Sequence, residues 1–203
     1  MKKLGREFYS KDTLVVAKEL LGKILVHKTE GKTLKAKIVE TEAYLGLNDK
    51  AAHSYGGKVT NRIKTMYDKP GIAYVYFIWG KHYCLNVITK KEGIPEGVLI
   101  RAFEPIENIN QIVLYRFNKS IEELNRYEKN NISNGPGKLT KAMNIDIKLN
   151  GEDLCKEKLY IETEKDSDFN IIETTRIGID YAEEAIDYDY RFYIENNSYV
   201  SRL

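Results

Sequence analysis

Residues 23–42 read KILVHKTEGKTLKAKIVETE, and this stretch decides how the chain folds. Two segments with strand character, 23–28 and 32–42, flank the turn-forming residues Thr29-Glu30-Gly31. Strand-like segments separated by a short, glycine-containing turn are typical of a β-hairpin. The sequence therefore predicts that these two segments pair as antiparallel neighbours.

The second strand of this hairpin carries two carboxylates where apolar side chains are expected. In its first half, apolar residues alternate with lysines, at Leu34, Ala36 and Ile38. Side chains along a strand point alternately to its two faces. If the strand stays regular, Glu40 and Glu42 lie on the apolar face, an unusual position for charged groups.

The rest of the chain alternates between strands and helices in one α+β domain spanning residues 1–203. Further strands are predicted at 72–79, 83–89, 98–103, 159–162, 176–179 and 191–194. Helices are predicted at Lys11–Leu21 after a Ser10 cap, from Pro105 to about Tyr127, and from Gly135-Pro136. Residues 44–71 form a long polar loop, which inside a compact domain is usually functional. We expect a curved, mostly antiparallel sheet flanked by helices.

Composition excludes several classes of protein. The longest apolar stretches, such as residues 72–79, are too short to cross a membrane, and no apolar region follows the first lysines to form a signal peptide. The two cysteines, Cys84 and Cys155, are expected to be free thiols in a reducing cytoplasm. No cysteine or histidine spacing indicates a metal site, so we expect neither metal nor cofactor.

The distribution of charge is more informative than the net charge of +2. Residues 1–105 carry 19 Lys and Arg against 11 Asp and Glu, whereas residues 106–203 carry 13 against 19. A basic segment of this kind attracts anionic partners such as nucleic acids. Ordinary scatter of surface charge is the alternative interpretation.

Glu42 is the first candidate for chemistry, because it ends a strand and opens onto the long loop. A carboxylate in that position can act as a general base toward water. The structural alternative is a strand-end glutamate that accepts a backbone N–H or pairs with an arginine or lysine. Position alone favours the structural alternative.

Aromatic residues concentrate around the same part of the sequence. Tyr44 follows Glu42 by two positions, Tyr74 and Tyr76 share one face of a strand, and Trp79 occupies the following turn. Flat aromatic side chains stack on nucleobases, although tyrosines also fill ordinary β-sheet cores. A tryptophan at a turn indicates a wedge or a contact with a partner.

Three polar residues interrupt otherwise apolar or small-residue surroundings. His53 lies in the long loop, Asn86 interrupts the strand Tyr83–Ile88, and Arg101 interrupts the strand Gly97–Phe103. A lone histidine is most often structural, and a buried amide needs hydrogen-bond partners. An arginine in so apolar a strand is either paired with a carboxylate or directed at a phosphate.

The order of these motifs resembles that of the alkyladenine-type 3-methyladenine DNA glycosylases, the methylpurine DNA glycosylase family. The resemblance covers about Leu14 to the C-terminus, except for about Glu107–Asn130. It rests on several blocks in family order: residues 38–46, 49–54, 60–62, 66–67, 69–71, 74–80, 84–87, 98–105, 134–140, 191–193 and 200–201.

The resemblance implies a reaction in which a damaged purine is flipped out of double-stranded DNA. The residue matching Glu42 activates the water that attacks C1′ of the sugar, which leaves an abasic site and an uncut strand. The residues matching Tyr44 on one side, and His53 and Tyr76 on the other, stack on the flipped base. The family's core is also thought to resemble the C-terminal domain of a formyltransferase.

The remaining site residues are likewise implied by the resemblance. The residue matching Asn86 obstructs the 2-amino group of normal guanine, and that matching Arg101 holds a backbone phosphate. Trp79 is the wedge that fills the gap left by the flipped base, assisted by Met66. The best-known members carry tyrosine at the wedge position, so this chain departs from them at Trp79.

Two alternatives remain open at this stage. One is a non-catalytic binder of distorted DNA that uses the same aromatic residues. The other is a different enzyme on a related fold, formyltransferase-like or directed at RNA. Among lesions, 3-methyladenine, 7-methylguanine, hypoxanthine and ethenoadenine all fit the expected pocket, and we expect a cytoplasmic monomer that meets no membrane and associates with the nucleoid when bound to DNA.

Overall fold

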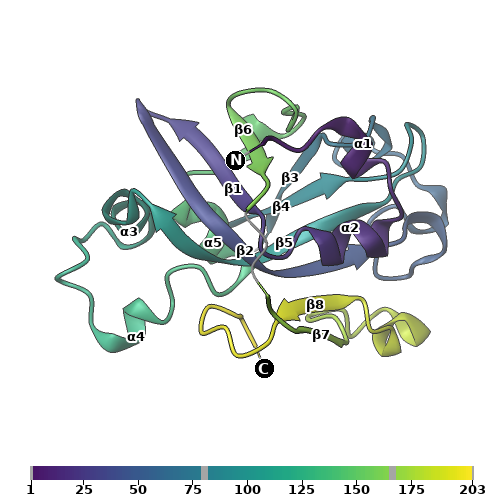
Figure 1. Ribbon diagram of the computed structural model, residues 1–203. Coiled ribbons are helices and arrows are strands. Elements are labelled where there is room, and N and C mark those ends of the chain that lie inside the picture. The colour runs from purple at the N-terminus through teal and green to yellow at the C-terminus, as the bar shows by residue number, and fades with distance from the viewer. Residues whose placement is uncertain (1, 79–81, 165–167, 203) are drawn as a thin grey trace.

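The computed structural model describes residues 2–78, 82–164 and 168–202, and the predicted hairpin lies at the centre of the fold (Figure 1). β1 (Ile24–Thr29) pairs antiparallel with β2 (Lys32–Tyr44). Glu30 and Gly31 form the turn, with φ of 49° and 72°. Positive φ at both turn residues suits the twist of a tight hairpin. The predicted hairpin is confirmed.

β2 is the strand around which the sheet is organised. On one side it pairs with β5 (Gly97–Glu107) from Lys35 to Tyr44. On the other side it pairs first with β1 and then, at residues 40–42, with β8 (Arg191–Ile194). The segment that carries Glu40 and Glu42 therefore has a hydrogen-bonded strand on each side.

The other strands extend this arrangement into a curled antiparallel sheet. They are β3 (Ala73–Ile78), β4 (His82–Ile88), β6 (Leu159–Glu162) and β7 (Ile171–Thr174). The main path runs β3-β4-β5-β2-β1-β6, while β8 pairs with both β2 and β7. In Figure 1, the β7–β8 pair at the yellow end of the chain lies below β2. The predicted α+β fold with a curved antiparallel sheet is confirmed.

The helices are shorter than the sequence predicted. α1 (Arg6–Tyr9) precedes α2 (Thr13–Glu19), which Asp12 caps in place of Ser10 by accepting the Leu14 N–H at 3.0 Å. α3 (Ile109–Phe117) ends at Asn118, whose left-handed φ of 58° breaks the helix predicted to reach Tyr127.

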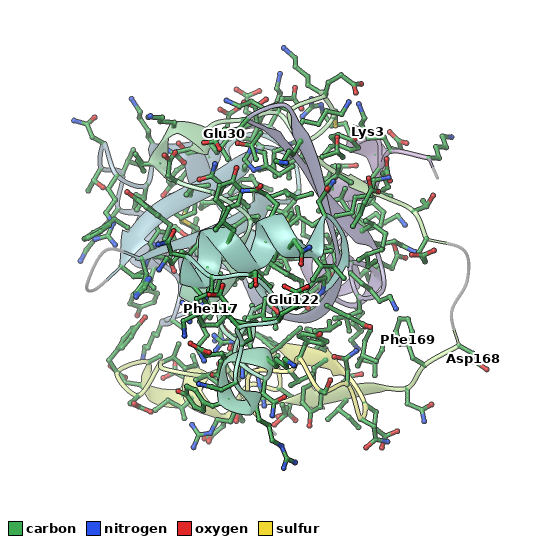
Figure 2. The ribbon with its side chains drawn as sticks, turned by 90° about the vertical axis from the view of Figure 1, so that its left-hand side faces the viewer. Lys3, Glu30, Phe117, Glu122, Asp168 and Phe169 are labelled. Carbon is green, nitrogen blue, oxygen red and sulfur yellow. The ribbon has the colours of Figure 1, made fainter. Side chains whose placement is uncertain are left out.

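The chain then forms the separate α4 (Arg126–Lys129), and α5 (Pro136–Ala142) begins at Gly135-Pro136 as predicted. In Figure 2, α3 crosses the front of the sheet with Phe117 at its end, and Glu30 marks the hairpin tip above it. Within the described residues, no helix combines the length and apolarity that a membrane crossing would need.

Glu40 and Glu42 are buried as predicted, but strict alternation is not the reason. The register between β2 and β5 shifts on both sides of Glu40, and shifts of this kind re-aim side chains. Val39 and Ala43 join the same core as Ile38. Both faces of this segment are therefore covered, which leaves Glu40 and Glu42 with no exposed surface.

The long loop after β2 is ordered by the segment that precedes β8. Three short 3₁₀ turns, Gly46–Asn48, Tyr55–Gly57 and Lys64–Tyr67, shape the loop. Residues 176–179 form no strand, so that prediction is wrong; Gly178, with φ of 77°, makes this segment irregular. Arg176 crosses to the loop and pairs with Asp49 at 2.5 and 2.8 Å.

We predict that Asp49→Ala destabilises the protein by about 3–5 kcal/mol, because it leaves the buried guanidinium of Arg176 without a carboxylate partner. The Asp49 and Arg176 side chains are 2% and 0% exposed, so solvent screening is weak. Urea unfolding followed by circular dichroism measures the change. Lys50→Ala is the matched control, since Lys50 pairs with Glu183 and Glu184 at the surface and its loss should change stability little. Equal effects of the two variants would contradict the prediction.

Candidate active site

A cavity of about 570 Å³ opens beside the middle of the sheet. Its walls come from β2, the long loop, β3, β4, β5 and the segment 176–181. Six of the residues predicted from the sequence line it: Tyr44, His53, Met66, Tyr76, Asn86 and Arg101. The fold therefore brings together side chains that lie up to 57 positions apart in the sequence, between Tyr44 and Arg101.

Glu42 lies directly behind this wall, in contact with three of the lining residues. The hydroxyl of Tyr44 donates to Oε2 at 2.8 Å, and Nη1 of Arg101 donates to the same oxygen at 3.2 Å. The backbone N–H of Ile177 donates to Oε1 at 2.8 Å. Glu42 therefore has both partners that a purely structural glutamate would have, an arginine and a backbone N–H. It also lies beside the cavity, where a role in chemistry stays open.

Tyr44 is held as a hydrogen-bond donor to this carboxylate. Burial, followed by the negative charge of Glu42, raises the pKa of Tyr44 well above its ordinary value. The phenol therefore stays protonated. Behind its ring, the Arg176 guanidinium lies 4.9 Å from the ring centroid, which is within the range of a cation–π contact. Tyr44 is consequently fixed at both its hydroxyl and one ring face.

Arg101 is paired with carboxylates, which is one of the two interpretations that its strand left open. Its Nε donates to Glu40 at 3.2 Å and its Nη1 to Glu42 at 3.2 Å. Burial opposes the charge, but the carboxylates of Glu42 and Glu40 outweigh it and raise the pKa of Arg101. Arg101 also lines the cavity, and contact with a DNA phosphate stays a prediction.

Another part of the cavity wall is built from rings that pack on one another. Tyr74 and Tyr76 stack with centroids 5.2 Å apart, and His53 meets Tyr76 edge-on at 4.6 Å. Nδ1 of His53 lies 3.0 Å from the Tyr74 hydroxyl. Packing removes water from the histidine ring and, together with the Arg62 charge, lowers the pKa of His53. This wall therefore offers uncharged aromatic surfaces at neutral pH.

β4 supplies the polar group at the floor of the cavity. Asn86 is 7% exposed, and its Nδ2 donates to the Tyr74 carbonyl at 3.3 Å. Cys84, two positions earlier on the same face, also lines the cavity. Burial raises the pKa of the Cys84 thiol to about 11, so it is protonated at neutral pH. Asn86 is braced by the strand beside it, as expected for a buried amide.

Met66 and Trp79 are the other two residues that were predicted to contact DNA. Met66 is only 4% exposed and packs with Ile63, Ile72, Tyr74 and Ile88. The structure places Met66 in the cavity wall, and its role of assisting the wedge stays a prediction. The other residue, Trp79, lies outside the described residues.

Sequence reasoning missed the contribution of residues 176–181. Ile177 donates its N–H to Glu42 and lines the cavity with Gly178, Ile179 and Tyr181. The sequence predicts a strand for residues 176–179 of this segment. The glycine inside that run was the signal against a regular strand, although contact with Glu42 across 135 positions had no local signal.

The arrangement combines a buried carboxylate with a cavity suited to a flat, polarisable ligand. Among the described residues, no group of histidine, cysteine, aspartate and glutamate side chains could hold a metal ion. The chemistry available from the residues present is therefore stacking by rings, hydrogen bonding by Asn86, and proton transfer by Glu42 beside Arg101.

Comparison with known proteins identifies the family. The family model described as methylpurine-DNA glycosylase matches residues 7–198. A relative from Desulfitobacterium hafniense (strain Y51) is 56% identical over 201 residues, which cover 99% of each chain. A relative from Clostridium botulinum (strain Loch Maree) is 59% identical over 200 residues, 98% of each chain. Both carry the provisional name 3-methyladenine DNA glycosylase. The chain belongs to the methylpurine-DNA glycosylase family.

Proposed function

We propose that this chain, by family a DNA glycosylase for alkylated bases, hydrolyses the glycosidic bond of damaged purines with Glu42 as its general base. The observation that carries the proposal is the Glu42 carboxylate, buried beside a cavity whose lining includes the rings of Tyr44, His53 and Tyr76. A general base next to stacking surfaces suits a flipped nucleotide better than it suits the recognition of base edges in the groove of duplex DNA.

Recognition begins when the damaged purine leaves the stack of double-stranded DNA and enters the cavity. Flipping costs a few kcal/mol, and stacking on aromatic rings contributes roughly 1–3 kcal/mol per contact. We assign Tyr44 to one face of the base, and His53 and Tyr76 to the other. An alkylated purine that carries a positive charge gains further attraction from these rings, and the neutral state of His53 avoids repelling it.

The chemical step requires one water molecule as nucleophile. As the bond between C1′ and the purine nitrogen breaks, the water oxygen bonds to C1′ and gives a proton to Glu42. The base leaves with the electrons of the broken bond, which its alkylation or protonation makes easier. A positioned general base of this kind contributes about 10²- to 10⁴-fold.

The cavity also favours an enzyme that leaves the DNA strand uncut. None of the described residues that line it is a lysine, whereas strand cleavage through a Schiff base needs an amine at C1′. The product is an abasic site in double-stranded DNA, and we expect the protein to act as a monomer.

The proposed substrates follow from the cavity and from the relatives. The names of the relatives point to 3-methyladenine, and the same aromatic walls accommodate 7-methylguanine and hypoxanthine. Asn86 is positioned at the cavity floor, where we assign it to obstruct the 2-amino group of normal guanine. We further propose that Trp79 fills the space that the flipped base leaves.

Glu42→Gln is expected to lower the single-turnover rate of base release by at least about 10²-fold, because the amide cannot take a proton from water. The measurement is the free base released, without added metal, from duplexes with one 7-methylguanine or one hypoxanthine, and 3-methyladenine released from methylated DNA. Glu104→Gln, on the neighbouring strand and outside this site, is the matched control and should retain the wild-type rate.

Binding of the same duplexes by both variants separates chemistry from recognition. Wild-type binding without release from any of the three lesions would identify a non-catalytic binder of distorted DNA. Undiminished release by Glu42→Gln would remove Glu42 from the mechanism and leave the glycosylase activity itself in place.

Asn86→Ala is expected to reduce discrimination against the 2-amino group by roughly tenfold or more, the usual value of a few contacts in a pocket. Guanine and hypoxanthine differ only by that group, so the ratio of their release rates from matched duplexes reports the effect. Cys84→Ala is the control, because it shortens a side chain of the same cavity wall that we do not assign to contact with the 2-amino group. An unchanged ratio in Asn86→Ala would show that Asn86 does not discriminate against the 2-amino group.

A further inference from the structure

The side chain of Glu40, two residues before the proposed base, accepts four hydrogen bonds. It has no exposed surface. Nε of Arg101 donates to it at 3.2 Å and Nη1 of Arg191 at 2.8 Å. Ser201 adds its backbone N–H at 2.7 Å and its hydroxyl at 2.8 Å. None of these contacts has a part in the chemistry proposed above.

We propose that Glu40, Arg191 and Ser201 are positioning residues. They hold Arg101 so that it donates to both Glu40 and Glu42, and in this way they set the pH at which Glu42 works as a base. The inference rests on the proposed role of Glu42. It concerns residues that touch neither the cavity nor, in this assignment, the substrate: none of the three is among the residues that line the cavity.

The sheet register explains how the network is assembled. At residues 40–42, β2 lies between β5 and β8. Arg191 stands opposite Glu42 in the β8 ladder, yet its guanidinium donates to Glu40. Arg101 comes from the other neighbouring strand and reaches both glutamates. The two flanking strands thus supply two cations to two carboxylates, a set with balanced charge.

Residues 199–202 complete the network from a distant part of the chain. Besides the two donors from Ser201, the Arg202 carbonyl accepts Nη1 of Arg191 at 2.8 Å. These contacts fix Arg191 and Glu40 relative to each other. With Glu40 held in this way, Arg101 keeps Nε toward Glu40 and Nη1 toward Glu42. The segment around Ser201 is therefore bound to the proposed base through two intermediates.

The charges around Glu42 decide the direction of any change. Arg101 and Arg191 bring two positive charges to this network, and Glu40 brings a negative charge beside that of Glu42. Other titratable groups that face Glu42 from the surrounding elements are Tyr44, Tyr76, Cys84, Arg176 and Tyr181. The tyrosines and the cysteine have raised pKa values and stay neutral, while Arg176 is neutralised by Asp49. The balance among Arg101, Arg191 and Glu40 therefore dominates.

A carboxylate base is active when ionised, so the rate falls as the pH drops through its midpoint. Glu40→Gln removes a negative neighbour, so the positive charge of Arg101 is no longer shared with a second carboxylate and stabilises the ionised form of Glu42 more strongly. This change lowers that midpoint. Arg191→Gln removes a positive neighbour and lets Glu40 draw Arg101 away from Glu42, which raises it. We expect shifts of about one pH unit in opposite directions, or roughly a tenfold difference in rate on the acid side.

The experiment is the pH profile of single-turnover base release from a duplex with one 7-methylguanine, whose ring already carries the positive charge. Wild type, Glu40→Gln, Arg191→Gln and the control Glu104→Gln are compared. Glu104 pairs with Lys37 and does not contact Arg101 or Glu42, so its variant should keep the wild-type midpoint. Acid unfolding of a destabilised variant would imitate such a shift. The folded fraction of each variant is therefore measured by circular dichroism at every pH, and each rate is divided by it.

Opposite shifts in Glu40→Gln and Arg191→Gln are the expected result. Wild-type midpoints in both variants, whatever their rate or stability, would overturn the proposal and leave the network a purely structural role. Failure of the underlying assignment looks different: wild type would show no acid limb, or Glu42→Gln would release base as fast as wild type.

Discussion

Holding Glu40 and Glu42 as charged groups without water is the constraint on which the rest of this structure depends. Both carboxylates lie in β2 with no exposed surface. Isolated charges are very costly to bury, so such groups persist only with ionic and hydrogen-bond partners. Arg101 from β5 and Arg191 from β8 supply them. The position of β2 between these strands is therefore a requirement of its charges as well as of its apolar residues.

The cavity follows from the same arrangement. Tyr44 extends β2 beyond Glu42 and is fixed by its hydrogen bond to that carboxylate and by Arg176. The Asp49–Arg176 pair holds the long loop against the segment 176–181, and this brings the Ile177 N–H to Glu42. Rigid aromatic walls and a fixed carboxylate are what stacking and proton transfer need. Structure and chemistry thus share one set of buried polar contacts.

The sequence predicted the features that depend on local pattern. The hairpin and the start of α5 at Pro136 follow from turn chemistry and capping. The burial of Glu42 was predicted from alternation, but it results from cover on both faces of β2 after the register shifts at Glu40. The ending of α3 depends on the left-handed Asn118, which has no distinctive pattern. Residues 176–179 looked like a strand because their apolar side chains face the cavity and its surroundings, which imitates alternation. The pairing of Asp49 with Arg176 spans 127 positions and needs the tertiary fold.

We propose that the cavity places a flipped purine so that its C1′ atom faces Glu42. A crystal structure of Glu42→Gln bound to a duplex with one 7-methylguanine tests this placement. The base is expected between Tyr44 and the His53–Tyr76 wall, with C1′ next to the side chain of residue 42 and a water molecule between them. A base that remains stacked in the duplex, or lies in the cavity with C1′ far from residue 42, would contradict it.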